Sequence, residues 1–188
     1  MKIIDKIATE LSNDDEEVEI VKYGLTQLFI LVIGLVAAAI TGFLLKIPLE
    51  TLFFLLLLFP LRQNAGGYHA SGRITCFLLS ALIFVGTIVL IKFFTIGIIG
   101  NAIIFLLGSV MLLPFAPVGN KNKPLDEKEK EVYGQRTIII WCAQSVLFVI
   151  LESQRVSPWT TIVALTVFIC GTLVAVGKIH EYILGMNK

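Results

Sequence analysis

His69 and Cys76 lie seven residues apart in the segment LRQNAGGYHASGRITCF, which covers residues 61–77. A cysteine thiolate attacks amide carbonyls and an imidazole returns a proton to the departing amine, so this pair is the minimum set for thiol-dependent cleavage of an amide. In one straight α-helix the two residues would share a face but would be separated by about 10.5 Å along the axis. A proton cannot pass directly over that distance, so the chain between them has to bend.

Glycines around the histidine permit such a bend. Gly66, Gly67 and Gly72 surround His69, and glycine adopts backbone conformations that strain other residues. We therefore expect His69 in an irregular turn and Cys76 in the first turn of the following helix. There the positive end of the helix dipole favours a thiolate.

A simpler interpretation of the pair stays open at this point. One histidine and one cysteine near a membrane boundary are often an interfacial side chain and a small packing side chain. Asn64 or Gln63 would serve as a third group that orients the imidazole, but no carboxylate lies close in the sequence. The three cysteines lack a C-x-x-C spacing, so we expect no metal site, no cofactor and no disulfide framework.

The composition indicates that the chain is surrounded by a lipid bilayer and not by water. The chain has 188 residues, of which 56% are hydrophobic and 15% charged, and its mean hydropathy is +0.88. A soluble domain of this size needs a far more polar surface. We predict a single all-α, membrane-embedded domain over residues 1–188 that is a polytopic integral membrane protein.

About six transmembrane helices are expected, the second of them short. Residues 1–22 precede them as an amphipathic helix on the membrane surface followed by an acidic helix start, without the features of a cleaved signal peptide. Residues 62–76 form a re-entrant or interfacial segment that carries the chemistry, and residues 115–136 form a basic loop. Trp141 and Trp159 are expected near opposite membrane surfaces. The predicted spans are 25–45, 51–61, 74–91, 98–114, 137–151 and 159–176.

The positive-inside rule orients this topology. If the N-terminus is cytosolic, only Lys46, Lys92 and Arg155 of the 15 lysines and arginines fall on the other side. Both termini, residues 62–76 and the loop 115–136 are therefore predicted to face the cytosol together. The loop is either a solvated connection or a clamp for an acidic substrate segment.

The two polar stretches resemble the accessory gene regulator protein B (AgrB) family of membrane endopeptidases, which process quorum-sensing prepeptides in Gram-positive bacteria. The first motif is R-x-x-x-G-G-x-H-A followed by a cysteine seven residues after the histidine. The second is A-P-x-x-x-x-N-K-P. Their residues in this sequence are Arg62, Gly66, Gly67, His69, Ala70 and Cys76 for the first motif, and Ala116, Pro117, Asn122, Lys123 and Pro124 for the second.

The resemblance implies that His69 and Cys76 form the catalytic dyad of a cysteine endopeptidase. Its substrate would be an AgrD-like prepeptide with an amphipathic leader, a central segment and an acidic tail. Cys76 would release the tail, hold the remainder as a thioester and let an internal thiol or hydroxyl close a thiolactone or lactone ring. The residues expected to bind the substrate or support the dyad are Arg62, Asn64, Gly66, Gly67, Arg73, Lys121, Asn122, Lys123 and Pro124.

The same resemblance implies a bacterial plasma-membrane protein that contacts the lipid bilayer, forms a homodimer and binds no nucleic acid. The main alternative is a small transporter or exporter of a peptide, whose usual mark is an ionisable residue in the middle of a span. The predicted spans have uncharged cores. A membrane acyltransferase with Cys76 as acyl carrier is a third interpretation, but no acyl-donor site is evident.

Overall fold

The computed structural model describes residues 15–68, 73–119 and 125–183. These residues form α-helices and one isolated parallel bridge, between Gly66 and Val118, and contain no strand. The all-α class is thus confirmed, whereas the amphipathic helix expected near the N-terminus lies mostly outside the described residues. The helices are α2 (Asp15–Leu44), α3 (Pro48–Ala65), α4 (Arg73–Phe93), α5 (Ile98–Leu112), α6 (Glu127–Ser153) and α7 (Trp159–Ile183).

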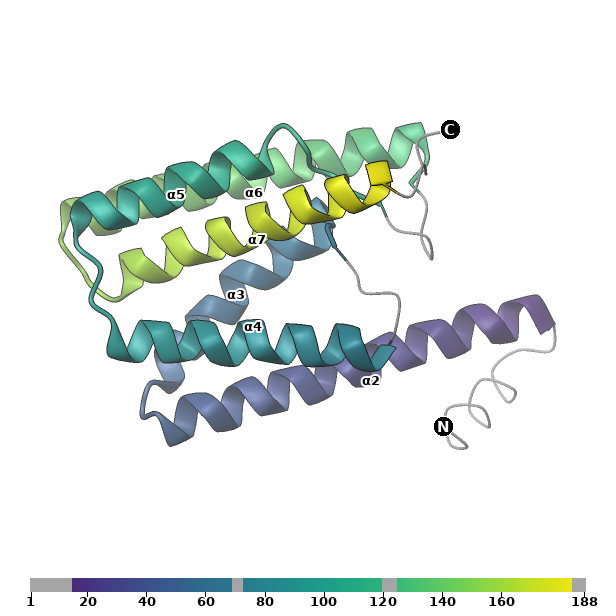
Figure 1. The fold of residues 1–188 in the computed structure, drawn as a ribbon, viewed down its shortest axis with the longest axis horizontal. Coiled ribbons are helices and arrows are strands. Elements are labelled where there is room, and N and C mark those ends of the chain that lie inside the picture. Colours follow the sequence, from purple (N-terminus) through teal and green to yellow (C-terminus); the bar gives the residue numbers. More distant parts are fainter. Residues whose placement is uncertain (1–14, 69–72, 120–124, 184–188) are drawn as a thin grey trace.

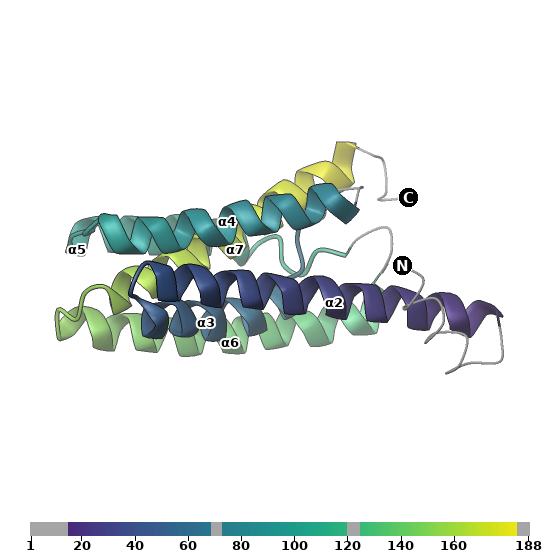
Figure 2. The same cartoon turned by 90° about the horizontal axis from the view of Figure 1, so that it is seen from below.

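In Figure 2, α2, α3 and α6 lie on one side of the molecule and α4 and α5 on the other, and α7 runs obliquely between the two sides. Helix α3 is inclined to the other helices (Figure 1). The end of α3, the start of α4, the start of α6 and the end of α7 lie at the same end of the molecule. The described turn residues Gly66 and Gly67 meet Val118 at this end.

Helix α7 is the centre of the packing. Residues 160–167 at its start are all buried, and it packs most extensively on α5. Gly108 and Gly171 allow the two helices to approach closely, because a Cβ atom on Gly171 would collide with the Gly108 backbone. Small residues at a contact of this kind are typical of helix pairs in membranes.

Polar side chains join the helices inside this bundle. Thr161 on α7 donates to Asn101 Oδ1 on α5 at 3.1 Å, and Trp141 Nε1 on α6 donates to Ser109 Oγ on α5 at 2.9 Å. Trp141 also stacks on Phe105. The indole N–H of Trp141 therefore has its partner within the bundle, and the placement of Trp141 and Trp159 near opposite membrane surfaces stays a prediction.

The outer faces of the helices are apolar. Leu82 on α4 and Ile99 on α5 are 70% and 76% exposed, as are many other large aliphatic and aromatic side chains along the bundle. Helices α6 and α7 are long and apolar enough to cross a membrane, and the apolar stretches within α2, α4 and α5 are shorter. These features are compatible with a membrane protein.

Two segments depart from their predicted boundaries. Helix α3 covers Pro48–Ala65 and not only residues 51–61, because Pro48 occupies a favourable first-turn position and the helix continues through Pro60. Helix α6 begins at Glu127, so the last ten residues of the predicted loop 115–136 are helical. The cause is a capping box in which Asp126 and Glu129 bond to each other's backbone N–H groups.

Candidate functional site

The turn that follows α3 has a left-handed backbone at two consecutive glycines. Gly66 has φ +67° and Gly67 has φ +118°, values that strain residues with a side chain. Space is restricted as well, since a Cβ atom on Gly66 would collide with the Val118 carbonyl oxygen and one on Gly67 would lie 2.8 Å from the Leu173 carbonyl oxygen. Both positions of the G-G pair therefore require glycine.

Arg62, in the last turn of α3, holds this turn in place. Its half-buried guanidinium donates through Nη1 to the Gly66 carbonyl and through Nη2 to the Tyr68 carbonyl at 2.9 Å. The planar fork of arginine suits two acceptors at once. Arg62 therefore points along the turn and joins its two ends.

The same turn is bonded to two distant parts of the chain. Gly67 N donates to Val118 O at 3.4 Å, and Val118 N donates to Ala65 O at 3.0 Å. On the other side Tyr68 N donates to Leu173 O of α7 at 2.7 Å. The two sequence motifs thus meet at the Gly66–Val118 bridge, directly before the segment that contains His69.

Gly177 on α7 is part of this junction, and nothing in the sequence identified it. A Cβ atom there would lie 2.6 Å from Tyr68 N and 2.7 Å from the carbonyl carbon of Gly67. A small residue on the last turns of α7 is therefore needed for the turn to approach the helix. Tyr68 in turn packs edge-to-face against His180, with ring centroids 5.2 Å apart.

The structure describes the predicted site residues to different degrees. Arg62 and Asn64 lie in the last turn of α3, followed by Gly66 and Gly67 in the turn. Helix α4 begins at Arg73, so Cys76 lies in its first turn; the side chains of both residues fall outside the description. His69, Lys121, Asn122, Lys123 and Pro124 lie outside the described residues altogether.

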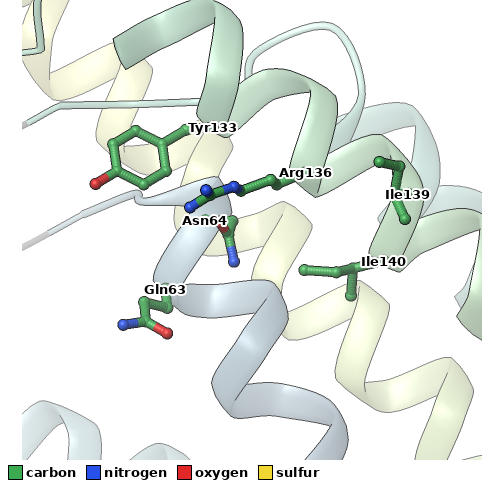
Figure 3. A pocket seen from close by; sticks show the side chains of 6 residues that line it. All are labelled: Gln63, Asn64, Tyr133, Arg136, Ile139 and Ile140. Atoms are coloured by element: carbon green, nitrogen blue, oxygen red, sulfur yellow. The ribbon is translucent and has the colours of Figure 1, made fainter.

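A cavity of about 350 Å³ lies beside the junction, between the last turn of α3 and the first half of α6 (Figure 3). Helix α3 contributes Gln63 and Asn64, both predicted as candidates to orient the imidazole. Helix α6 contributes four residues, of which only Arg136 had a predicted role, as part of the basic loop 115–136. These are Tyr133, Arg136, Ile139 and Ile140.

Among the described residues that line this cavity, Arg136 is the one cationic side chain. The guanidinium of Arg136 extends toward Asn64 and the side of Tyr133, whereas Ile139 and Ile140 flank the cavity further along α6 (Figure 3). The Asn64 side-chain amide donates to Pro60 O at 2.8 Å, which leaves its carbonyl side for other contacts. Recognising these residues from sequence would have required the helical start of α6, because the spacing Tyr133, Arg136 and Ile140 places them on one helix face.

The acidic residues at the start of α6 weaken the predicted basic clamp. Lys130 pairs with Glu127 at 2.8 Å, and its hydrogen bond to Glu127 raises the Lys130 pKa above its usual value. Asp126, Glu127, Glu129 and Glu131 outnumber Lys128 and Lys130 in residues 126–131. Residues 126–131 therefore carry more acidic than basic side chains, and the predicted clamp has to rely on basic residues elsewhere in the loop.

No solved structure matches this chain. An AgrB-like protein of Clostridium perfringens (strain SM101 / Type A) is 35% identical over 136 residues, which are 69% of this chain and 64% of that protein. A second AgrB-like protein, from strain 13 / Type A of the same species, is 33% identical over the same shares of both chains. The matched residues span less than two thirds of the length of these curated relatives. The family described as Accessory gene regulator B matches residues 1–175, and the chain belongs to this family.

Proposed function

We propose that this protein is a membrane cysteine endopeptidase of the accessory gene regulator quorum-sensing system, with Cys76 as nucleophile and His69 as proton carrier. Membership of the AgrB family supports a role in that system. The observation that carries the proposal is the junction formed by Arg62, Gly66 and Gly67 with Val118 and Leu173. It ties down the chain on one side of His69, while α4 starts on the other side with Cys76 in its first turn.

The chemistry follows from these residue types. The Cys76 thiolate attacks a peptide carbonyl, and the C–N bond breaks as His69 protonates the leaving nitrogen. The tail departs and the remainder of the peptide stays on Cys76 as a thioester. A thiol or hydroxyl within the peptide then attacks the thioester carbonyl, which closes a thiolactone or lactone and returns the thiol of Cys76.

The substrate in this proposal is an AgrD-like prepeptide held at the lipid bilayer. Membrane attachment raises its effective concentration at the dyad and limits its directions of approach. Exclusion of water by the surrounding helices protects the thioester from hydrolysis before the ring closes. Lys121 and Lys123, with Asn122 and Pro124 of the second motif, attract and seat its acidic tail.

The proposed topology is multi-pass, with the termini and the active site on the cytosolic side of a bacterial plasma membrane. It rests on the distribution of lysines and arginines and on the gathering of the α3, α4, α6 and α7 ends at one end of the bundle. The cytosol also keeps a catalytic thiol reduced. A homodimer is part of the proposal by family resemblance.

Reconstitution tests this function. The full-length protein in liposomes should cleave the prepeptide encoded beside its gene into two products. Their masses should sum to the mass of the intact peptide when the ring closes, and to that mass plus one water when the thioester is hydrolysed instead. Cys76→Ser and His69→Ala should abolish cleavage, while Cys142→Ser, which changes an exposed cysteine of α6, should retain it. Cleavage by the Cys76→Ser protein would remove the peptidase proposal, and peptide transport without cleavage would favour an exporter.

A further inference from the structure

We propose that the cavity between α3 and α6 is a binding site for a carboxylate of the peptide substrate, with Arg136 as its charged anchor. The inference rests on the proposed peptidase function for the identity of the ligand. Its structural basis is independent of the dyad, because it depends on the six described residues that line the cavity.

The guanidinium of Arg136 differs from the charged group of Lys130 in having no acidic partner among the described residues. Among the residues that the structure describes, no carboxylate pairs with its guanidinium, although its helix carries four acidic residues within residues 127–152. The nearest cation on the same helix, Lys130, is by contrast paired with Glu127. Arg136 therefore keeps its positive charge available toward the cavity.

The other lining groups fit a carboxylate on an aliphatic stem. A guanidinium binds a carboxylate through two parallel N–H···O bonds. The side-chain amide of Gln63 is exposed and supplies a further N–H donor. Ile139 and Ile140 offer apolar contact for the methylene groups next to such a carboxylate, and a volume of about 350 Å³ is within the range of small-ligand sites.

The position of the cavity favours a peptide over a lipid as the source of the carboxylate. Gln63 and Asn64 belong to the same helical turn as Arg62, which holds the glycine turn before His69. A substrate segment in the cavity would therefore lie next to the glycine turn that leads to His69. An anionic lipid headgroup offers a phosphate of similar charge, and the test has to separate the two.

Binding is best measured without cleavage, in the Cys76→Ala protein held in phosphatidylcholine nanodiscs. The probe is a fluorescent synthetic copy of the prepeptide encoded beside the gene, and a second copy has every Asp and Glu replaced by its amide. Adding Arg136→Gln should weaken binding of the first peptide at least about tenfold, the scale of hydrogen bonds to a charged group. For the amide peptide, the affinities of the proteins with and without Arg136→Gln should differ by less than about twofold.

Arg155→Gln is the matched control, because Arg155 lies in the α6–α7 connection at the other end of the bundle, and it should not change binding. Arg136→Lys should recover only part of the affinity, since an ammonium lacks the fork. Equal binding by the Arg136→Gln protein would overturn the proposal. So would an equal loss for both peptides, or a loss seen only when phosphatidylglycerol is present. Cleavage is assayed separately, so a failed peptidase test leaves this binding result intact.

Discussion

At the scale of single residues, the glycine turn after α3 determines where the segment with His69 begins. Gly67 combines a φ of +118° with close contact to the Leu173 carbonyl. Gly67→Ala should therefore cost about 1–3 kcal/mol of stability and lower peptide processing, as measured by thermal unfolding in detergent and by product mass. Gly34→Ala is the control, because a Cβ atom at Gly34 meets nothing within 4 Å. Equal stability of the two variants would contradict this role of Gly67.

Arg62 acts at the same scale by bonding two carbonyls of the turn. Arg62→Lys keeps the charge but reaches only one acceptor well, so it should reduce kcat for processing at least about tenfold. Binding of the prepeptide to a Cys76→Ala background should change little. If Arg62→Lys weakened peptide binding and left kcat unchanged, the residue would contact substrate and would not position the turn.

At the scale of helices, the α5–α7 contact offers the clearest prediction. The Gly171 Cα lies against the Gly108 backbone, so Gly171→Ala would push the two helices apart. We expect a loss of about 1–3 kcal/mol in unfolding free energy, the usual cost of overpacking. Gly86→Ala on α4 serves as the control, since nothing lies within 4 Å of its added Cβ. A stable Gly171→Ala protein would mean that α5 and α7 are not this close in the membrane.

Helix boundaries show how far the sequence alone predicts this fold. The segment 98–114 agrees closely with α5 at Ile98–Leu112, and the segment 159–176 begins where α7 begins. Long apolar runs bounded by Gly or Pro are strong local signals. The start of α6 was missed because a charged run predicts a loop until the Asp126 and Glu129 capping box is recognised.

The candidate site was predictable only in part, for a related reason. The turn at Gly66 and Gly67 follows from local backbone chemistry. The bridge from Gly66 to Val118 and the contact of Tyr68 with Leu173 join residues far apart in the sequence, and periodicity carries no information about such pairs. The cavity could not be predicted for two reasons. It requires α6 to be helical at Arg136, where a loop was predicted, and it requires α6 to lie beside α3, which is a long-range contact.

At the scale of the whole molecule, the proposed orientation predicts which residues face outward. Single cysteines placed at Lys128 and Arg155 in a protein without its native cysteines should differ in labelling. A membrane-impermeant maleimide added to intact cells should label the Arg155→Cys protein, and the Lys128→Cys protein only after permeabilisation. The reverse pattern would place the termini and the active site outside the cell.

The central claim is that Cys76 carries the substrate as an acyl group. Rapidly acid-quenched reactions of the liposome-bound protein with the prepeptide should contain an adduct on the Cys76 peptide whose mass equals the prepeptide without its tail. Brief hydroxylamine treatment should remove this adduct, as expected for a thioester, and the Cys76→Ser protein should show no such thioester. Cleavage that proceeds at the native rate with Cys76 unmodified at every time point would contradict the account.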